Sequence, residues 1–286
     1  MTEEEYRAYD AQNYSRLSAF MQGPDFALLP HDHKSYFEEG HAFEALCIDA
    51  AQGSDLFHDR FFECDVIGKM PDKLVTWIED GVDLTTLYTY NKDGATLNKT
   101  KKITHAYLDA CQKHPGKVPM GADQMATLNR MVKNLMKMPV MGRTVKEIFS
   151  IAEFGVPIIW ERDGIEKKAL LDVFVKGKGF PNIVFDLKST ADMMRFRKMY
   201  RDKYWIQEVH YMEGVREKYG ATDPFVFLTA MKAAPNVAQP FAMDDEMMAL
   251  ARVKYTELCT DFHEWEMKGS PSVGYLTMQA LKPYFG

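Results

Sequence analysis

The chain has 286 residues, 46% of them hydrophobic and 13% aromatic, so it can bury a substantial core without disulfides or a structural metal. Its formal net charge of -6 excludes a surface that is basic throughout, so binding to a polyanion would depend on a local basic stripe. The start is acidic and lacks a secretory signal, and no apolar run approaches the ~20 residues that span a bilayer, so we expect a cytoplasmic protein without a membrane segment.

The first part of the chain is predicted to be helical. Ser15 can cap a short helix that runs to about Gln22, where Gly23-Pro24 breaks it. A second helix is expected over residues 36–50, because their apolar positions recur at helical spacing.

The stretch from about residue 61 to residue 140 is harder to interpret. Helices are expected over two of its segments, residues 103–113 and 122–137, and neither carries a chemical motif. No Pro/Ser-rich linker or shift in composition separates this stretch from its surroundings. We therefore interpret it as an insertion in a single domain that spans residues 1–286.

The centre of the chain changes to a β-strand pattern. Residues 156–162 and 168–175 are joined through Asp163-Gly164, a dipeptide that favours a tight hairpin turn. A third strand is expected over residues 183–189. Together these runs predict an antiparallel meander of three strands.

A long helix is predicted over residues 191–218, with Thr190 as its cap and Gly220 at its end. A strand at residues 225–229 follows, so strand, crossover helix and strand form a βαβ unit. The last helical pattern, residues 244–268, begins with capping acids and should pack on the sheet. The predicted fold is α/β with α+β character, a central mixed sheet with an antiparallel meander and a βαβ crossover, flanked by helices.

Two acids and a lysine are predicted to converge on this meander. Side chains alternate faces along a strand, so Asp186 and Lys188 point the same way, while Leu187 points into the core and offers its carbonyl. Asp172 lies one hairpin turn earlier. Carboxylate and carbonyl oxygens suit Mg²⁺ or Mn²⁺, which would bind a scissile phosphate and lower the pKa of an attacking water. A lysine beside them can orient that water.

The residues around Asp186 favour a metal site over a purely structural role. An isolated Asp-x-Lys is better explained by a solvated hairpin with a surface salt bridge. Here Val184 and Phe185 precede the aspartate and Leu187 follows it. Charges in so apolar a strand are costly unless function or pairing retains them.

The helix after this strand carries a stripe of polar and aromatic residues. Its members, spaced by four, three and four positions on one face, are Tyr200, Tyr204, Gln207 and Tyr211. An aromatic stripe is more often core than site. The amide of Gln207 is the exception, because it suggests a polar task at the metal site or on a phosphate backbone.

Five cations fall within nine residues at the start of the same helix. They are Arg195, Arg197, Lys198, Arg201 and Lys203. A charge run is usually only a solvated face. Directly beyond an acidic strand, this one would supply the local phosphate-binding stripe that the net charge lacks.

A third metal ligand could come from the helix expected over residues 36–50. Glu44 lies there and could bring another carboxylate to the metals, although alone it is no better than an ordinary surface glutamate. His41, one turn earlier, is the competing candidate. Imidazole is the poorer ligand for Mg²⁺, which favours Glu44.

These residues resemble the RecE-type (exonuclease VIII) branch of the PD-(D/E)XK nucleases, which have a restriction-endonuclease-like core. The likeness is closest in Asp186-Leu187-Lys188-Ser189-Thr190-Ala191-Asp192, Arg195-Phe196, Tyr200, Gln207 and Pro224-Phe225-Val226-Phe227-Leu228. Two N-terminal segments are also similar to helices of that nuclease domain, Tyr14-Ser15-Arg16-Leu17-Ser18 and Gly40-x-Ala42-Phe43-Glu44. Together they span most of the chain, and residues 61–137 match only loosely.

The resemblance implies a metal site for Mg²⁺ or Mn²⁺. Asp172 and Asp186 would bind the metals together with the Leu187 carbonyl. Glu44 stands where the helix of the family supplies a histidine or a glutamate. Leu170-Leu171 precede Asp172 where RecE-like sequences usually show Arg-x-Arg-Pro, which leaves the ligand in place but removes nearby positive charge.

The resemblance also implies roles around the metals. Lys188 would assist the nucleophile. Gln207 and Tyr211 would form the Gln-x-x-x-Tyr motif of RecB-like nucleases. Met231-Lys232 replaces a frequent Glu-Lys and is a second departure from the family pattern.

The implied activity is ATP-independent degradation of linear double-stranded DNA from its ends, 5′ to 3′, which leaves a 3′ single strand for a RecT-like annealing protein. No P-loop Gly-Lys-Ser or Gly-Lys-Thr occurs, in agreement with the lack of a nucleotide cofactor. Family members form rings around DNA, so a homo-oligomer is expected, in a bacterial or phage-infected cell. Two alternatives stay open, a single-strand or branch-specific DNA nuclease of the same fold and a catalytically silent DNA-binding homologue.

Overall fold

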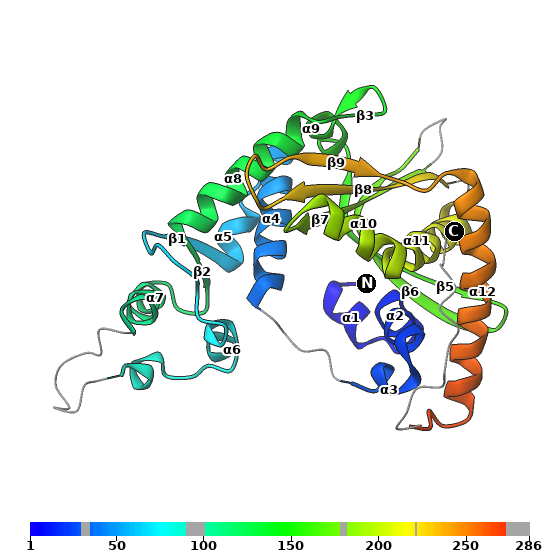
Figure 1. Ribbon diagram of the computed structural model, residues 1–286, viewed down its shortest axis with the longest axis horizontal. Coiled ribbons are helices and arrows are strands. Elements are labelled where there is room, and N and C mark those ends of the chain that lie inside the picture. The colour runs from blue at the N-terminus through cyan, green and yellow to red at the C-terminus, as the bar shows by residue number, and fades with distance from the viewer. Residues whose placement is uncertain (30–34, 90–100, 178–181, 221, 273–286) are drawn as a thin grey trace. The chain divides into compact units, whose positions relative to one another are not determined.

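The chain divides into two compact units, which a computed structural model describes over residues 1–29, 35–89, 101–177, 182–220 and 222–272 (Figure 1). The first unit holds Met1–His31, Ile151–Thr229 and Gln239–Gly286, and the second holds Asp32–Ser150 and Ala230–Ala238. The stretch at residues 61–140 lies wholly in the second unit. Its interpretation as an insertion in one nuclease domain stays a prediction.

The first unit is built on a five-stranded sheet in the order β5-β6-β7-β8-β9. Its strands are β5 (Glu153–Arg162), β6 (Ile165–Val175), β7 (Asn182–Thr190), β8 (Thr222–Met231) and β9 (Ala238–Phe241). The first three form the antiparallel meander that the sequence predicts. Asp163 and Gly164 make the turn between β5 and β6, and their φ angles of 55° and 76° are both left-handed, as a two-residue hairpin of this kind requires.

Helices connect and cover this sheet. They are α1 (Glu3–Ala8), α2 (Tyr14–Gln22), α3 (Pro24–Ala27), α10 (Met193–Met199), α11 (Trp205–Tyr219) and α12 (Asp245–Met267). α10 and α11 link the neighbouring strands β7 and β8, which is the crossover of the predicted βαβ unit. The central mixed sheet flanked by helices is therefore confirmed.

Three details of the predicted helices are wrong. The helix expected over residues 191–218 is interrupted by a π-helix, Tyr200–Tyr204, between α10 and α11. Its cap is Asp192, whose Oδ1 accepts from the Arg195 amide at 2.7 Å, because Thr190 is still the last residue of β7. Likewise α2 is capped by the side chain of Asn13 and not by Ser15, which lies inside the helix.

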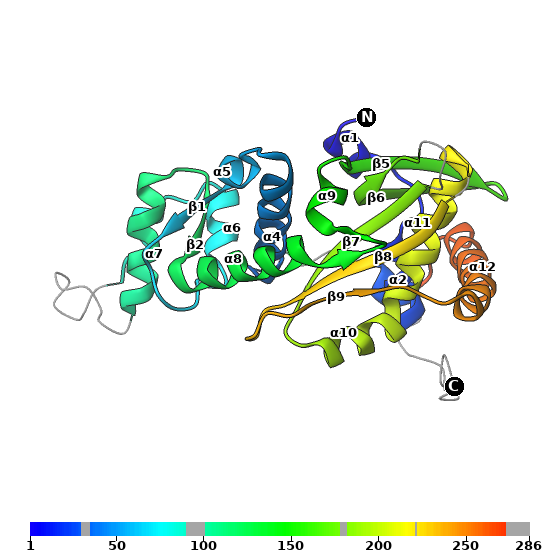
Figure 2. The same ribbon diagram turned by 90° about the horizontal axis from the view of Figure 1, so that it is seen from above.

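α11 packs unusually close to the sheet. It contacts β5, β6 and β7 on one side and α2 and α12 on the other, so it lies between the sheet and α12 (Figure 2). Every residue from Trp205 to Val215 is buried. A Cβ atom at Gly214 would lie 2.7 Å from both Ile158 Cδ1 and Trp160 Cζ3 of β5. Only glycine allows this approach.

We predict that Gly214→Ala destabilises the protein by about 1–3 kcal/mol, because the added methyl group overpacks the contact with β5. The matched control is Gly40→Ala in another helix, where nothing lies within 4 Å of the added Cβ atom. There alanine should raise the free energy of unfolding by up to ~1 kcal/mol through its helix propensity. Urea unfolding of the two variants checks both signs, and equal effects would contradict the close approach.

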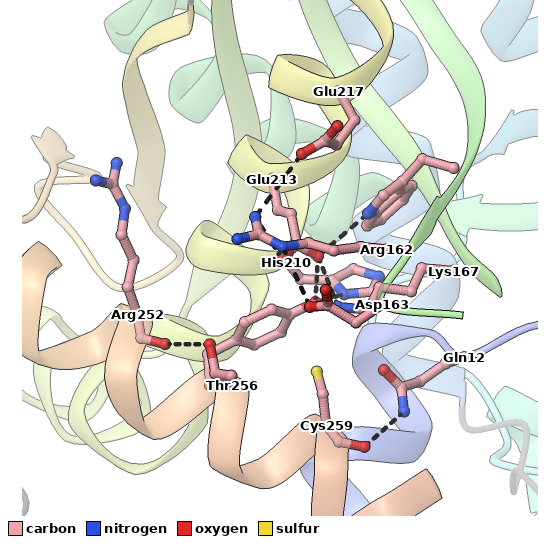
Figure 3. A network of polar contacts seen from close by, with 12 residues as sticks. Gln12, Arg162, Asp163, Lys167, His210, Glu213, Glu217, Arg252, Thr256 and Cys259 are labelled. Atoms are coloured by element: carbon pink, nitrogen blue, oxygen red, sulfur yellow. Dashed lines mark hydrogen bonds and ion pairs between the residues drawn. The ribbon is translucent and has the colours of Figure 1, made fainter. Parts of the chain in front are cut away.

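A buried polar network fixes the face of α11 that is turned toward β5, β6 and α12 (Figure 3). Glu213 Oε2 accepts from Lys167 Nζ of β6 at 2.7 Å and from Trp160 Nε1 of β5 at 3.1 Å. Glu213 Oε1 lies 3.2 Å from Arg162 NH1. The carboxylate is thus paired and hydrogen-bonded, which is the condition for burying a charge.

His210 extends the same network as a neutral imidazole. Its Nε2 lies 2.9 Å from the carbonyl of Lys168, so this nitrogen carries the proton and donates it. Its Nδ1 lies 2.6 Å from the hydroxyl of Tyr255 on α12 and accepts from it. Burial lowers the pKa of His210 to about 4. Protonation would therefore require breaking a contact between α11 and α12.

The lowered pKa of His210 predicts a loss of stability in mild acid. Between its ordinary pKa of 6.5 and its folded pKa of about 4, the unfolded chain binds the extra proton, so stability decreases as the pH falls through this window. From neutral pH to about pH 5 the loss should be about 2 kcal/mol. Urea unfolding against pH measures it, and the contribution should disappear in His210→Gln. An unchanged pH dependence in that variant would contradict the burial of a neutral imidazole.

The second unit is mainly helical. Its helices are α4 (Ser35–Gln52), α5 (Leu56–Arg60), α6 (Leu74–Glu79), the 3₁₀ helix Leu84–Leu87, α7 (Lys102–Lys113), α8 (Ala122–Lys137) and α9 (Val145–Phe149). Its short strands are β1 (Phe61–Cys64), which pairs in parallel with β2 (Val118–Gly121), and β3 (Pro139–Val140), which pairs with β4 (Arg143–Thr144). The three helices predicted in this region are confirmed as α4, α7 and α8, whereas its strands were not predicted. None of the described helices of the chain is long and apolar enough to cross a membrane.

Candidate active site

Asp172 and Asp186 lie side by side on neighbouring strands. β6 and β7 pair in a register that sets Val173 opposite Phe185, and one further step sets Asp172 opposite Asp186. Residues opposite each other on an antiparallel pair project from the same face of the sheet. Asp172 Oδ2 also accepts from the amide of Leu187 at 3.1 Å. The meander thus brings the two predicted acids together.

Lys188 follows Asp186 by two residues and shares its face. Its ammonium group forms an ion pair with Asp186 Oδ1. The Asp186 side chain is completely buried, and that of Lys188 is 21% exposed. Burial alone would lower the pKa of Lys188, but the negative charges of Asp186 and Asp172 raise it above its ordinary value. Lys188 is therefore a cation at neutral pH.

Gln207 and Tyr211 reach the same place from α11. Gln207 Nε2 donates to Asp186 Oδ2 at 2.5 Å, so each oxygen of this carboxylate has its own partner. Tyr211, one turn later, is buried. Burial raises its pKa, and the negative charges of Asp172 and Asp186 raise it further. The Gln-x-x-x-Tyr spacing thus places both side chains beside the acids.

Asp186 is the electrostatic centre of the site. Burial and the negative charge of Asp172 raise its pKa to about 8, although the Lys188 ammonium group opposes this rise. When both carboxyl groups are ionised, the local charge is one carboxylate in excess of its cation. A divalent cation would neutralise that excess, which is the physical reason to expect a metal here.

The donor set suits a hard cation. It comprises the Asp172 and Asp186 carboxylates, to which the sequence adds the Leu187 carbonyl as a predicted ligand. Among the described residues no group of three or more His, Cys, Asp and Glu side chains is placed to hold a metal. A pair of carboxylates completed by water and substrate oxygens is the usual environment of Mg²⁺. These residues fit Mg²⁺ or Mn²⁺ better than zinc, which prefers nitrogen and sulfur ligands.

Two further tyrosines border the site, Tyr14, which was not predicted as a site residue, and Tyr204, which was predicted only as part of the aromatic stripe. Burial raises the pKa of Tyr14 on α2, Lys188 lowers it and Asp186 raises it, so the phenol lies within the field of both groups. Tyr204 of the π-helix lies with its ring centroid 5.6 Å from Lys188 Nζ. The sequence holds no local signal for Tyr14, because α2 precedes β7 by more than half of the chain.

A cavity of about 290 Å³ lies next to Tyr14 and Tyr211. Its lining comes from the N-terminal helices and their connection, from β6 and from α11: Tyr6, Arg7, Asn13, Tyr14, Ser15, Lys168 and Tyr211. Of these lining residues, Tyr14 and Tyr211 have pKa values that burial raises and that the negative charge of Asp186 raises further.

The basic residues after β7 do not form one uniform group. Four of them are exposed, Arg195, Arg197, Lys198 and Arg201. Lys203 is half-buried. The predicted stripe that contains Tyr200 is also altered, because the π-helix turns the Tyr200 hydroxyl to Glu208, to which it donates at 2.7 Å.

Glu44 and His41 lie on α4 of the second unit, and both are half-buried. His41 Nδ1 lies 3.6 Å from Glu38 Oε1. Glu38 is completely buried and accepts from the exposed Arg60 at 2.8 Å, a pair that sequence reasoning missed. The proposed contribution of Glu44 or His41 to the metal site stays a prediction.

Comparison with known proteins identifies the family of this chain. The family described as a PDDEXK-like domain of unknown function (DUF3799) matches residues 46–272, which is most of the chain. The protein belongs to this family. Its Asp186-Leu187-Lys188 has the (D/E)XK spacing that the family name states, while Leu171 stands before Asp172 in place of the proline. The match shows the PD-(D/E)XK superfamily, and the RecE branch stays a prediction.

Solved structures support the fold of this DUF3799 member. The crystal structure of a "putative exonuclease" from Eubacterium rectale matches with a TM-score of 0.50 and 12% identity, over 95% of this chain and 88% of that chain. Likeness at that identity shows the fold alone. SSO0001, with a TM-score of 0.29 and 13% identity over 85% of this chain and 97% of that one, is too distant to support an argument. No curated protein matches the sequence.

The raised pKa of Asp186 predicts that metal binding depends on pH. Below about pH 8 the metal must displace a proton from this carboxyl group, so the apparent Mn²⁺ affinity should fall about tenfold for each pH unit and level off above it. Isothermal titration calorimetry in buffers of different ionisation enthalpy measures the affinity and the released proton. Asp186→Asn should abolish both effects. Constant affinity between about pH 6 and about pH 8 would contradict this prediction.

Proposed function

We propose that the protein is a divalent-metal-dependent nuclease that hydrolyses phosphodiester bonds of DNA. The observation that carries this proposal is the pair of facing carboxylates, half-buried Asp172 and completely buried Asp186, beside the Lys188 ammonium group and aligned by Gln207. Such a pair is expensive to bury for stability alone. A metal ion and a phosphate bound at the site would offset this free-energy cost of burial.

Mg²⁺ or Mn²⁺ would be held by Asp172, Asp186 and the Leu187 carbonyl, with Glu44 as a further ligand and His41 as its alternative. When bound, the metal would polarise the scissile phosphate and lower the pKa of the attacking water. This water would attack phosphorus, and the bond from phosphorus to the leaving ester oxygen would break.

The protein's own groups would position these reactants. Lys188, with its raised pKa, stays an ammonium group, so it donates hydrogen bonds to the water or to the phosphate and does not act as a base. Gln207 holds Asp186 Oδ2 and thereby orients the carboxylate. Tyr211 and the exposed cations Arg195, Arg197, Lys198 and Arg201 would contact the DNA backbone.

We further propose that it acts as an ATP-independent exonuclease on linear double-stranded DNA, 5′ to 3′, and leaves 3′ single strands. Support comes from the resemblance to the RecE branch around Asp186-Leu187-Lys188. It also comes from the description of the similarly folded Eubacterium rectale protein as an exonuclease. A ring-shaped homo-oligomer and a RecT-like annealing partner belong to the same proposal.

A cleavage assay tests this function. With Mn²⁺ or Mg²⁺, the protein should shorten end-labelled linear duplex from its 5′ ends, leave closed circular duplex intact and need no ATP. Equal cutting of closed circles would indicate an endonuclease. Faster cutting of single-stranded or branched DNA than of blunt duplex would favour the alternative nuclease.

Matched variants assign the chemistry to the proposed residues. Asp186→Asn should lower the cleavage rate by ~100-fold or more, because it removes a charged metal ligand. The control is Asp163→Asn, an equally small change in the β5–β6 turn, where asparagine tolerates the left-handed φ of 55°. It should cleave like the unmodified protein. Wild-type protein that binds Mn²⁺ and DNA but never cleaves would indicate a silent homologue.

A further inference from the structure

The π-helix Tyr200–Tyr204 marks the junction of α10 and α11, next to the proposed site. A π-turn holds an additional residue, so the side chains before it are rotated relative to those after it, and such turns are frequent at functional sites. In this chain Lys203 and Tyr204 are consecutive at the junction, and the Tyr204 ring lies near Lys188 of β7. Tyr204 stacks near Phe227 of β8, with ring centroids 5.6 Å apart. Its ring is therefore held in place.

Lys203 and Lys188 approach the same aromatic ring. Lys203 Nζ lies 5.6 Å from the Tyr204 ring centroid, and Lys188 Nζ lies at the same distance from it. The two ammonium groups are thus separated by at most twice this distance. Burial lowers the pKa of Lys203, and the positive charge of Lys188 lowers it further, as expected for neighbouring cations.

The two lysines differ in their partners. Lys188 is paired with Asp186. Within the described part of the chain no carboxylate pairs with the Lys203 ammonium group. A half-buried cation without a counter-ion, next to a second cation, is unfavourable in the free protein. An anion bound at this place would remove that cost.

We propose that Lys203 binds the phosphate next to the scissile one on the same DNA strand. This assignment rests on the nuclease function proposed above, in which Lys188 serves the scissile phosphate. Consecutive phosphates of one strand lie closer together than twice 5.6 Å, which is the largest distance that the shared Tyr204 ring allows between the two ammonium groups. The four exposed cations differ from Lys203, which is half-buried and shares the Tyr204 ring with Lys188. Of these four, Arg197 lies over another ring, that of Phe241, at 5.9 Å.

The test uses linear duplexes in which one phosphate at a time is replaced by an uncharged methylphosphonate, cleaved in Mn²⁺. For wild-type protein, kcat/KM should fall about tenfold at one non-scissile position, mainly through KM. In Lys203→Gln that penalty should be absent, and the dependence of log kcat/KM on log salt should be shallower by about 0.9. Lys203→Arg should keep the penalty.

The matched control is Lys218→Gln, which removes an exposed lysine at the far end of α11. It should behave like wild-type protein at every methylphosphonate position. Lys203→Met keeps the aliphatic stem and replaces Lys203→Gln if the latter does not fold. The same penalties in wild-type protein and in the uncharged variant would overturn the role of Lys203 alone. Wild-type protein that cleaves no DNA would overturn the nuclease function and this role together.

Discussion

Two carboxylates, those of Asp172 and Asp186, face each other on neighbouring strands, and this contact sets the requirements for the residues around it. Burying an unpaired carboxylate costs on the order of several kcal/mol. Lys188 and Gln207 supply partners for both oxygens of Asp186, and the Leu187 amide supplies one for Asp172. All three partners depend on the register of β6 with β7 and on the position of α11.

The position of α11 is fixed by contacts that begin one turn after Gln207 along the helix. Gly214 allows it to approach β5, while Glu213 and His210 bind side chains or backbone of β5, β6 and α12. Because hydrogen bonds are directional, this network restrains rotation of the helix about its axis, which packing alone would restrain less. Gln207, earlier on the same helix, is thereby aimed at Asp186. A polar network remote from the acids thus contributes to their geometry.

Most of the site could be predicted because its parts are local in sequence. The alternation of faces along a strand places Asp186 with Lys188, and a hairpin turn brings Asp172 opposite them. The amide of Gln207 was conspicuous because it interrupts an aromatic stripe. Tyr14, Tyr204 and the special position of Lys203 could not be predicted in this way. They depend on α2 packing against the site and on a π-turn, and neither has a pattern in the sequence.

The sequence by itself determined the meander, the Asp163-Gly164 turn, the crossover between β7 and β8 and the convergence of two acids with a lysine. These follow from short-range rules, the two-residue period of strands and the backbone preferences of glycine and aspartate. Only the tertiary structure decided which cations are exposed, which residues cap the helices and how α11 is oriented. Those features depend on contacts between segments far apart in the chain, where burial and hydrogen bonding outweigh local preference.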